Sequence, residues 1–261
     1  MSRLMLCGLM AGVILCSSAP ARADDAEDNA VAFVKEKLGG SVIRDNARPG
    51  KPVVAVLYSN VSAVTDAALK ELATFKSLTK LDLYGTKVTD EGMKELATLT
   101  NLTSLSLPET VTDAGLKELA ALKTLTSLDI TRTSVTDAGL KELAAIKNLN
   151  NLIMSRTKIE GAGLKELAAL KNLTSLDLSN TAVTDASMKE LATLKTITKL
   201  NLSSTQVTDV GLRELAALKN LTTLDLTTIY LTDPKVTDAG VKVLQNLLPK
   251  CKISRGYRGG R

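Results

Sequence analysis

A sequence motif of about 24 residues is repeated along most of this 261-residue chain, and the repetition constrains the fold more than any other feature. A recurring Thr-Asp dipeptide aligns the copies, and Glu160-Gly161 fills the place of one degenerate copy. The dipeptides stand at Thr65-Asp66, Thr89-Asp90, Thr112-Asp113, Thr136-Asp137, Thr184-Asp185, Thr208-Asp209 and Thr237-Asp238. The step is 24 residues, apart from one step of 23 and a last step of 29. A fixed period of this length predicts a solenoid, in which each repeat stacks on the next.

Each repeat combines two hydrophobic periods. Residues 173–178 read Leu-x-x-Leu-x-Leu, and this segment ends in the alternation typical of a strand with one buried face. Thr184 is then a candidate N-cap, and Asp185 would place negative charge at the positive end of a helix dipole. Apolar residues recur at helical spacing over 188–194. One strand and one helix cannot bury their apolar faces alone, so we predict a parallel sheet on an inner wall and helices on an outer wall.

The composition predicts an aliphatic interior and excludes several kinds of catalytic site. The chain has no Trp and no His, with only 2 Phe and 4 Tyr. Without histidine, His-based triads, imidazole general bases and the common zinc sites are excluded. The sequence also contains no P-loop and no dinucleotide-binding glycine signature. We therefore expect a protein that is not an enzyme and that uses no cofactor and no metal.

The consensus LxxLxLxxTxVTDxGLxxLxxLxx resembles the leucine-rich repeat, in the variety related to ribonuclease-inhibitor-like and cysteine-containing repeats. It is especially similar to secreted bacterial leucine-rich repeat proteins. The match covers roughly residues 53–253. The resemblance implies an α/β fold, a right-handed curved solenoid with a parallel β-sheet on the concave face and α-helices on the convex face. It also implies that the concave sheet is the usual interaction surface.

One position departs from the pattern of that family. Where the family often has Asn or Cys, whose side chains satisfy backbone groups in the turn after the strand, this chain has threonine. A threonine hydroxyl can do the same, and its β-branch suits an extended backbone. We predict a ladder of threonines buried along the stack. Its members are Thr86, Thr110, Thr133, Thr157, Thr181 and Thr205.

The ends of the chain differ from the repeats. Residues 1–23 have the pattern of an export signal, with a positive start, an apolar run and a small-x-small cleavage site before Asp24. A lipoprotein signal at Cys16 is the alternative, which is less favoured because Leu15 is bulky where such signals want a small residue. No later segment is apolar enough to cross a bilayer. The remaining divisions are an N-terminal capping helix and strand over 24–52, a solenoid with a C-terminal cap over 53–253, and a basic disordered tail over 254–261.

Cys251 is the one cysteine left after removal of residues 1–23, so we expect no internal disulfide. Its place in Leu248-x-x-Cys251-x-Ile253 matches a core leucine of residues 173–178. Residues 250–261 carry five cations, whereas residues 24–249 have a net charge of about −2. The positive charge thus belongs to the tail, which is either a solubilising end, the interpretation we favour, or a contact for anionic polymers. A nucleic-acid partner is not expected.

The strand positions between the inward leucines face the concave side and form the candidate site. Aspartates occupy every second repeat in one of these columns, which separates them by roughly 10 Å. That spacing lies near the upper limit for a catalytic carboxylate pair and is too wide for two aspartates to hold one calcium ion. We favour the interpretation that the alternation keeps like charges apart. The predicted binding residues are Lys80, Asp82, Tyr84, Asp129, Arg132, Asp177, Lys199, Asn201 and Asp225, with Tyr230 in a five-residue insertion.

These features favour an exported, monomeric recognition scaffold that has no catalytic activity and binds a protein or an envelope polymer through its concave sheet. The signal directs such a protein to the periplasm, the cell envelope or the extracellular space. The alternative is a structural component of the envelope or cell surface without a dedicated ligand, and a carboxylate-dependent hydrolase is less favoured. Tyr84, beside Lys80 and Asp82, is the leading local candidate because Tyr is common in protein hot spots. Tyr230 either contacts a partner or covers the core near the end of the stack. We favour the covering role.

Overall fold

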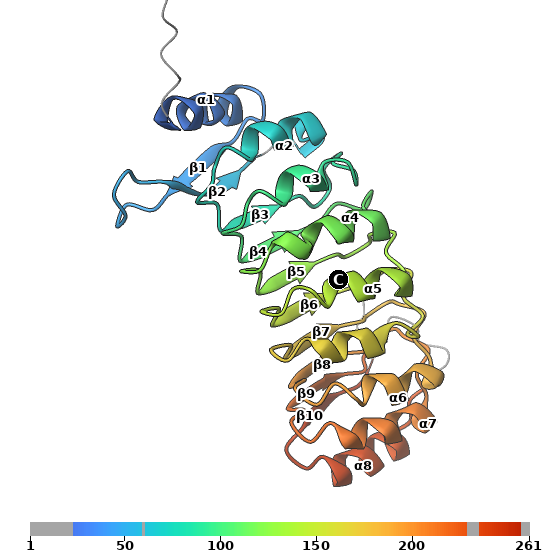
Figure 1. Cartoon of the computed structure of the whole chain (residues 1–261). Helices are drawn as coiled ribbons and strands as arrows, with labels where there is room; N and C mark the ends of the chain where they lie inside the picture. The colour runs from blue at the N-terminus through green and yellow to red at the C-terminus, as the bar shows by residue number, and fades with distance from the viewer. Residues whose placement is uncertain (1–22, 59–60, 229–234, 257–261) are drawn as a thin grey trace, which may run out of the picture.

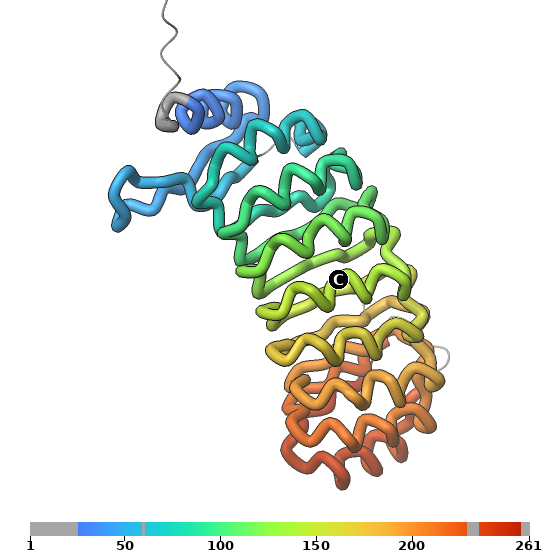
Figure 2. Tube along the Cα trace, in the orientation of Figure 1, coloured from blue at the N-terminus to red at the C-terminus, as the bar shows by residue number. Residues whose placement is uncertain are grey.

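The computed structural model describes residues 23–58, 61–228 and 235–256. They form one stack of thin layers that bends along its length, as Figure 1 and Figure 2 show. The predictions made for residues 1–22, for Tyr230 and its neighbours and for residues 257–261 lie outside the described residues.

The inner, concave wall is one sheet of ten strands that follow one another in sequence order. β1 pairs antiparallel with β2, and all later neighbours are parallel. From β3 on, the pairing joins equivalent residues of successive repeats, so that Leu105 lies between Leu81 and Leu128. The strands are β1 Ser41–Arg44, β2 Val53–Leu57, β3 Lys80–Asp82, β4 Ser104–Ser106, β5 Ser127–Asp129, β6 Asn151–Ile153, β7 Ser175–Asp177, β8 Lys199–Asn201, β9 Thr223–Asp225 and β10 Lys252–Ser254. The predicted fold class, an α/β solenoid with a parallel sheet, is therefore confirmed.

The outer, convex wall consists of short helical segments, one per layer (Figure 1). The α-helices are α1 Ala23–Glu36, α2 Asp66–Leu72, α3 Met93–Leu96, α4 Asp113–Glu118, α5 Leu140–Leu143, α6 Met188–Leu191, α7 Asp209–Leu212 and α8 Asp238–Leu247. The 3₁₀ helices are η1 Val61–Ala63, η2 Leu119–Ala121, η3 Asp137–Gly139, η4 Leu164–Ala169, η5 Asp185–Ser187 and η6 Arg213–Ala217. The helices predicted within the repeats are thus shorter than expected and partly 3₁₀. In so short a segment most backbone groups belong to a helix end, where 3₁₀ bonds are common.

The interior is one continuous aliphatic core that runs from Ala30 in α1 to Cys251 before β10. The inward leucines of the strands and helices are almost completely buried, and Leu128 and Leu140 are typical with no exposed surface. Cys251 is 3% exposed, so the prediction that it takes a core leucine position is confirmed. Burial raises the pKa of its thiol.

The N-terminal end of the stack is covered by α1 and a hairpin. Ala30, Val34 and Leu38 are fully buried against the first layer. Arg44 in β1 donates to Glu27 of α1 at 2.7 Å and so ties the hairpin to the helix. A helix and a strand, as predicted within residues 24–52, are present as α1 and β1. The division of the chain into a cap, a solenoid and a tail stays a prediction.

Consecutive layers are joined by a rung of hydrogen bonds at the start of each helical segment. The carboxylate of Asp113 accepts from the backbone N–H of Thr136 at 2.8 Å and from its hydroxyl at 2.7 Å. The same pair of bonds recurs between Asp66 and Thr89, Asp90 and Thr112, Asp185 and Thr208, and Asp209 and Thr237. The repeated Thr-Asp dipeptide therefore does more than begin a helix, because in these five pairs the aspartate fixes the threonine of the next repeat. Asp137, which is followed by the degenerate repeat, instead accepts from the backbone N–H groups of Glu160, Gly161 and Gly163.

The degenerate repeat shows how the rung is replaced when its aspartate is missing. Gly161 stands where other repeats have Asp, and Ser187 stands where the following repeat otherwise has Gly. A Cβ at a regular position such as Gly211 would collide with the carboxylate of Asp185. Behind Gly161 there is no carboxylate, so a serine fits, and its hydroxyl donates to the carbonyl of Glu160 at 2.7 Å. The contact between layers is therefore made in two ways. In regular repeats an aspartate faces the glycine of the next repeat, and in the degenerate repeat Gly161 faces Ser187 of the next repeat.

The threonine ladder is confirmed at five of the six predicted positions. In each of the five, the hydroxyl donates to the carbonyl oxygen three residues earlier, over 2.6–2.8 Å. The buried members are Thr86, Thr133, Thr157 and Thr181, and Thr205 is half-buried. These hydroxyls satisfy a turn carbonyl inside the stack, which is the role that the family gives to Asn or Cys.

The prediction for Thr110 is wrong. This residue is exposed, and its hydroxyl donates to the carbonyl of Val88 in the preceding layer. The turn after β4 belongs to the 23-residue repeat and is one residue shorter than the others. Counting back from Val111, Thr110 occupies the position that Lys87 holds before Val88, so it does not reach the ladder.

Candidate functional site

The concave wall presents two columns of strand residues that are exposed or half-buried. One column runs Lys80, Ser104, Ser127, Asn151, Ser175, Lys199 and Thr223, and the other runs Asp82, Ser106, Asp129, Ile153, Asp177, Asn201 and Asp225. The sheet register therefore places the predicted strand residues side by side, with aspartates in alternate layers from β3 to β9. Most of the wall is formed by small polar side chains.

The aspartates of the concave wall close the turns that follow their strands. Oδ1 of Asp129 accepts from the N–H of Thr131 at 2.8 Å, and Asp82 and Asp177 accept in the same way from the residue two positions later. Ser106 needs no such acceptor, because the residue two positions later is Pro108, which has no N–H.

Turn closure thus accounts for Asp82, Asp129 and Asp177, and Pro108 accounts for Ser106, whereas Ile153 offers no acceptor to the N–H of Ser155. Separation of like charges stays a prediction. Asn201 also donates to the second oxygen of Asp177 at 2.8 Å. Within the described ranges, no group of three His, Cys, Asp or Glu residues is placed to hold a metal ion.

The N-terminal end of the concave wall is different in character. Nη1 of Arg132 donates to the hydroxyl of Tyr84 at 3.0 Å and lies 3.4 Å from a carboxylate oxygen of Glu109. Both bonds raise the pKa of the Arg132 guanidinium. Tyr84 is 41% exposed, and two large apolar side chains of the hairpin, Ile43 and Leu57, are 46% and 55% exposed. We call these residues, with Lys80, the N-terminal patch.

The register places the strand residues of the N-terminal patch, Ile43, Leu57 and Lys80, on the same side of the sheet. Ile43 pairs with Ala55, and Ala55 pairs with Lys80. Leu57 lies two residues beyond Ala55 on β2 and therefore shares its face. Tyr84 follows β3, and its hydroxyl reaches Arg132, which follows β5, so the side-chain pair crosses the turn after β4.

The backbone of Arg132 adds a second observation. The residue before each ladder threonine has a positive φ, as at Gly85 with φ 72° and Asn180 with φ 56°. Glycine and asparagine adopt this left-handed region readily, whereas most side chains lose about 1 kcal/mol there. Arg132 and Arg156 occupy the same position with φ of 63° and 57°. Two adjacent layers thus hold arginine where the backbone favours glycine, and such strain directs attention to function.

The C-terminal half of the concave wall contains the other predicted residues. Asp177 and Asn201 bond to each other, and each accepts from the N–H of the residue two positions later. Lys199 is exposed, and Asp225 accepts from the N–H of Thr227 at 2.9 Å. The structure therefore separates the nine predicted residues into the cluster at the N-terminal patch and a set of mainly turn-closing residues.

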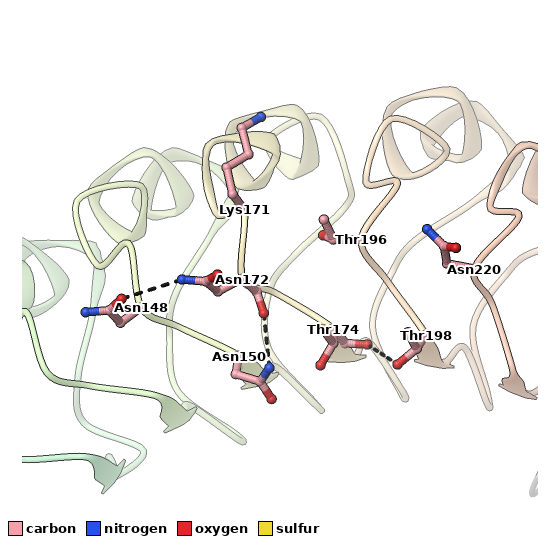
Figure 3. A pocket seen from close by; sticks show the side chains of 8 residues that line it. All are labelled: Asn148, Asn150, Lys171, Asn172, Thr174, Thr196, Thr198 and Asn220. Atoms are coloured by element: carbon pink, nitrogen blue, oxygen red, sulfur yellow. Dashed lines mark hydrogen bonds between the residues drawn. The ribbon is translucent and has the colours of Figure 1, made fainter.

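A groove lies at one edge of the sheet, where helical segments lead into β6 to β9, with a volume of about 620 Å³ (Figure 3). Its lining is formed by Asn148, Asn150, Lys171, Asn172, Thr174, Thr196, Thr198 and Asn220. The lining contains amides, hydroxyls and one ammonium group, without a carboxylate or a large apolar side chain. We call it the edge groove.

Comparison with known proteins identifies the family. Four segments, residues 76–97, 121–144, 169–192 and 193–216, match the family model described as Leucine Rich repeat. The chain is a leucine-rich repeat protein. A search of curated proteins finds no match to this leucine-rich repeat protein.

Two solved structures from Listeria monocytogenes share its fold. An internalin (inlF) is 24% identical with a TM-score of 0.55, over 74% of this chain and 51% of that one. An internalin C2 (inlC2) is 24% identical with a TM-score of 0.60, over 87% of this chain and 92% of that one. The leucine-rich repeat protein thus spans about half the length of the inlF structure. Among the described residues, no helix has both the length and the apolar character needed to cross a membrane.

Sequence reasoning missed three members of the N-terminal patch, namely Ile43, Leu57 and Glu109. Ile43 lies in the segment predicted as a cap and Leu57 near the start of the predicted solenoid, and neither was assigned to the concave face. β1 and β2 are however paired with the concave columns, and alternate residues of the hairpin must face that side. Glu109 follows Pro108 in the shortened turn, and its reach toward Arg132 depends on the fold.

Proposed function

We propose that this leucine-rich repeat protein is a recognition scaffold without catalytic activity, and that it binds a protein partner through the N-terminal patch. The observation that carries the proposal is the exposed Tyr84–Arg132 pair at the end of the concave wall where Ile43 and Leu57 are exposed as well. Tyrosine and arginine are enriched in protein hot spots, and apolar side chains beside them supply area that loses contact with water on binding. The strained backbone of Arg132 supports the proposal, because a glycine there would suit the fold better.

The arrangement of the aspartates gives a hydrolase little support. The carboxylates of Asp82, Asp129 and Asp177 each accept a turn N–H group and so serve the fold, and the sheet register keeps these aspartates two strands apart. A structural envelope component would not need the exposed apolar and arginine side chains of the patch. We keep that function as the second candidate.

Export is part of the proposal. The positive start, the apolar run and Ala21-Arg22-Ala23 support a cleaved signal that delivers the chain to the periplasm, the envelope or the outside of the cell. In a bacterial host that expresses the full chain, mass spectrometry of the exported protein should show an N-terminus at Asp24. Retention of an uncleaved chain in the cytoplasm would contradict this step.

The site is tested by capturing envelope proteins on the immobilised wild-type protein and then measuring the affinity of each captured protein for variants. Lys80 and Lys199 occupy the same concave column at its two ends, so Lys80→Ala and Lys199→Ala form a matched pair. Tyr84→Ala and Lys80→Ala should lower the affinity for a genuine partner, and Tyr84→Ala should lower it by about 10-fold or more. Lys199→Ala should change the affinity by less than about 2-fold. Equal losses at both ends, or a loss at Lys199 alone, would overturn the assignment to the N-terminal patch.

A further inference from the structure

The turn that leads from each helical segment into the next strand carries a lysine in six of seven successive layers. These residues form the lysine row, which consists of Lys76, Lys123, Lys147, Lys171, Lys195 and Lys219. All six are exposed. The seventh layer has Thr100 at this position. One cation therefore recurs per layer along this edge of the stack.

The edge that holds the lysine row has no acidic residues of its own. In every layer the ten residues that end at the central strand leucine, such as 167–176, contain no Asp and no Glu. Among the ion pairs between described residues, none involves the lysine row. Lys76, Lys123, Lys171 and Lys195 instead donate to neutral oxygens, for example Lys171 to the carbonyl of Ala168 at 2.7 Å.

The convex helices offer a contrast in the same layers. There each Lys is followed directly by Glu, as in Lys141-Glu142, whose charged atoms lie 3.8 Å apart. Charges of both signs therefore alternate on the convex wall, while the edge carries one sign only. Because the chain from residue 24 to 249 is slightly acidic, the positive edge is a local feature and does not follow from net charge.

The edge groove lies against the lysine row and is held in place by its backbone. The amide nitrogen of Asn148 donates to the carbonyl of Lys123 at 2.8 Å, and Asn220 donates to that of Lys195 at 2.9 Å. Asn172 bonds in the same way to Lys147 and lies beside Asn148 (Figure 3). The amide N–H groups are thus used within the fold. Amide oxygens and threonine hydroxyls along the groove are suited to accept hydrogen bonds from a ligand.

We propose that the lysine row and the edge groove bind an extended acidic polysaccharide. A row across many layers at about 5 Å per layer fits a polymer with regularly spaced carboxylates better than a small anion. Ammonium groups would pair with the carboxylates, and amide oxygens and hydroxyls of the groove would bond the sugar hydroxyls. A single-stranded nucleic acid fits less well, because it is held by stacking on aromatic side chains. In the described part of the chain the only large exposed aromatic residue, Tyr84, follows the carboxyl end of β3, away from this edge.

The test uses the full-length mature chain and polygalacturonate as the probe, with neutral dextran and single-stranded DNA as comparison ligands. The edge variant replaces Lys147, Lys171 and Lys195 by Gln. The control variant replaces Lys141, Lys165 and Lys189 by Gln, which removes the same charge from the same layers but on the convex wall. Both sets are exposed, so both variants should keep the wild-type melting temperature.

The wild type should bind polygalacturonate more tightly at low salt than at about 0.2 M salt, and more tightly than it binds dextran or DNA. The edge variant should lose about 10-fold or more in affinity and show a smaller salt dependence, whereas the control variant should change by less than about 2-fold. Equal losses in the two variants would overturn the proposal, since net charge alone would then explain binding. Tighter binding of DNA, equal binding of dextran, or no binding of polygalacturonate by the wild type would overturn it as well.

Discussion

The two ends of the concave wall are built by the same repeat but carry different side chains. In both halves strand-end residues such as Asp82, Asp129, Asp177 and Asn201 close turns. The position of positive φ holds Asn180 and Ser204 in the C-terminal half. In the N-terminal half the same position holds Gly85, Arg132 and Arg156, and Arg132 bonds to exposed Tyr84. The C-terminal half therefore shows what the fold alone requires. The arginine and tyrosine side chains at the N-terminal end are not required by the fold, so we attribute them to function.

If this comparison is correct, the two halves should depend equally on the contacts between layers. Asp113→Gly in the N-terminal half and Asp185→Gly in the C-terminal half each remove two hydrogen bonds to a charged acceptor. Each should lower the free energy of unfolding by about 3 kcal/mol, as measured by chemical denaturation. A loss in one half that is several times the loss in the other would show that the halves differ in more than their concave surface.

The degenerate repeat supplies a rescue for the same experiment. Gly139→Ser alone should destabilise, because its Cβ would meet the carboxylate of Asp113. Combined with Asp113→Gly, the serine has room and can bond to the preceding layer as Ser187 does. The double variant should recover about 1 kcal/mol or more relative to the sum of the single variants. If the effects of the two single variants simply add, the replacement of Asp by Gly and of Gly by Ser at Gly161 and Ser187 is not energetically coupled.

Mutations at the two ends of the concave wall should differ in their effect on partner binding, and this effect should be smaller than the effects on stability given above. Truncation of Tyr84 should cost about 1.5–2 kcal/mol of binding free energy, as expected for a hot-spot residue, while Thr223→Ala near the other end of the wall should cost less than about 0.5 kcal/mol. Isothermal titration calorimetry with a captured partner measures both. A larger loss for Thr223→Ala would move the site to the C-terminal half.

Alkaline pH should affect both ends through buried groups. Burial raises the pKa of Tyr58 after β2, with a further rise from Asp82, and burial raises the pKa of Cys251. Each folded pKa lies above its unfolded value, so the stabilisation is complete below the unfolded pKa and is lost as pH rises toward the folded one. Between pH 8 and pH 10 the free energy of unfolding should fall by about 1 kcal/mol.

Tyr58→Phe and Cys251→Ala should each reduce the slope of that fall. Tyr58→Phe should not destabilise at pH 7, because the buried hydroxyl of Tyr58 has no hydrogen-bond partner among the described residues. An unchanged slope in both variants would show that other groups cause the alkaline loss.

The sequence predicted the fold and most of the wall because both depend on periodicity. The period placed each inward leucine, each concave residue and five of six ladder threonines. It failed at Thr110, where one deleted residue shifts the turn, and it made no prediction for Ile43, whose face is set by pairing with β2. Contacts across layers, such as Arg132 with Tyr84 and Glu109, depend on how far a side chain reaches over the turn between them, which no spacing in the sequence encodes.

The most direct test of the central claim needs no partner. Arg132→Gly removes the strain of a positive φ together with the exposed bonds to Tyr84 and Glu109, and Asn180→Gly changes the equivalent position in the C-terminal half. If Arg132 is kept for recognition, chemical denaturation should show that Arg132→Gly leaves the free energy of unfolding unchanged or raises it by up to about 1 kcal/mol. A loss of about 1 kcal/mol or more, with no such loss for Asn180→Gly, would mean that Arg132 serves the fold, and the claim would fail.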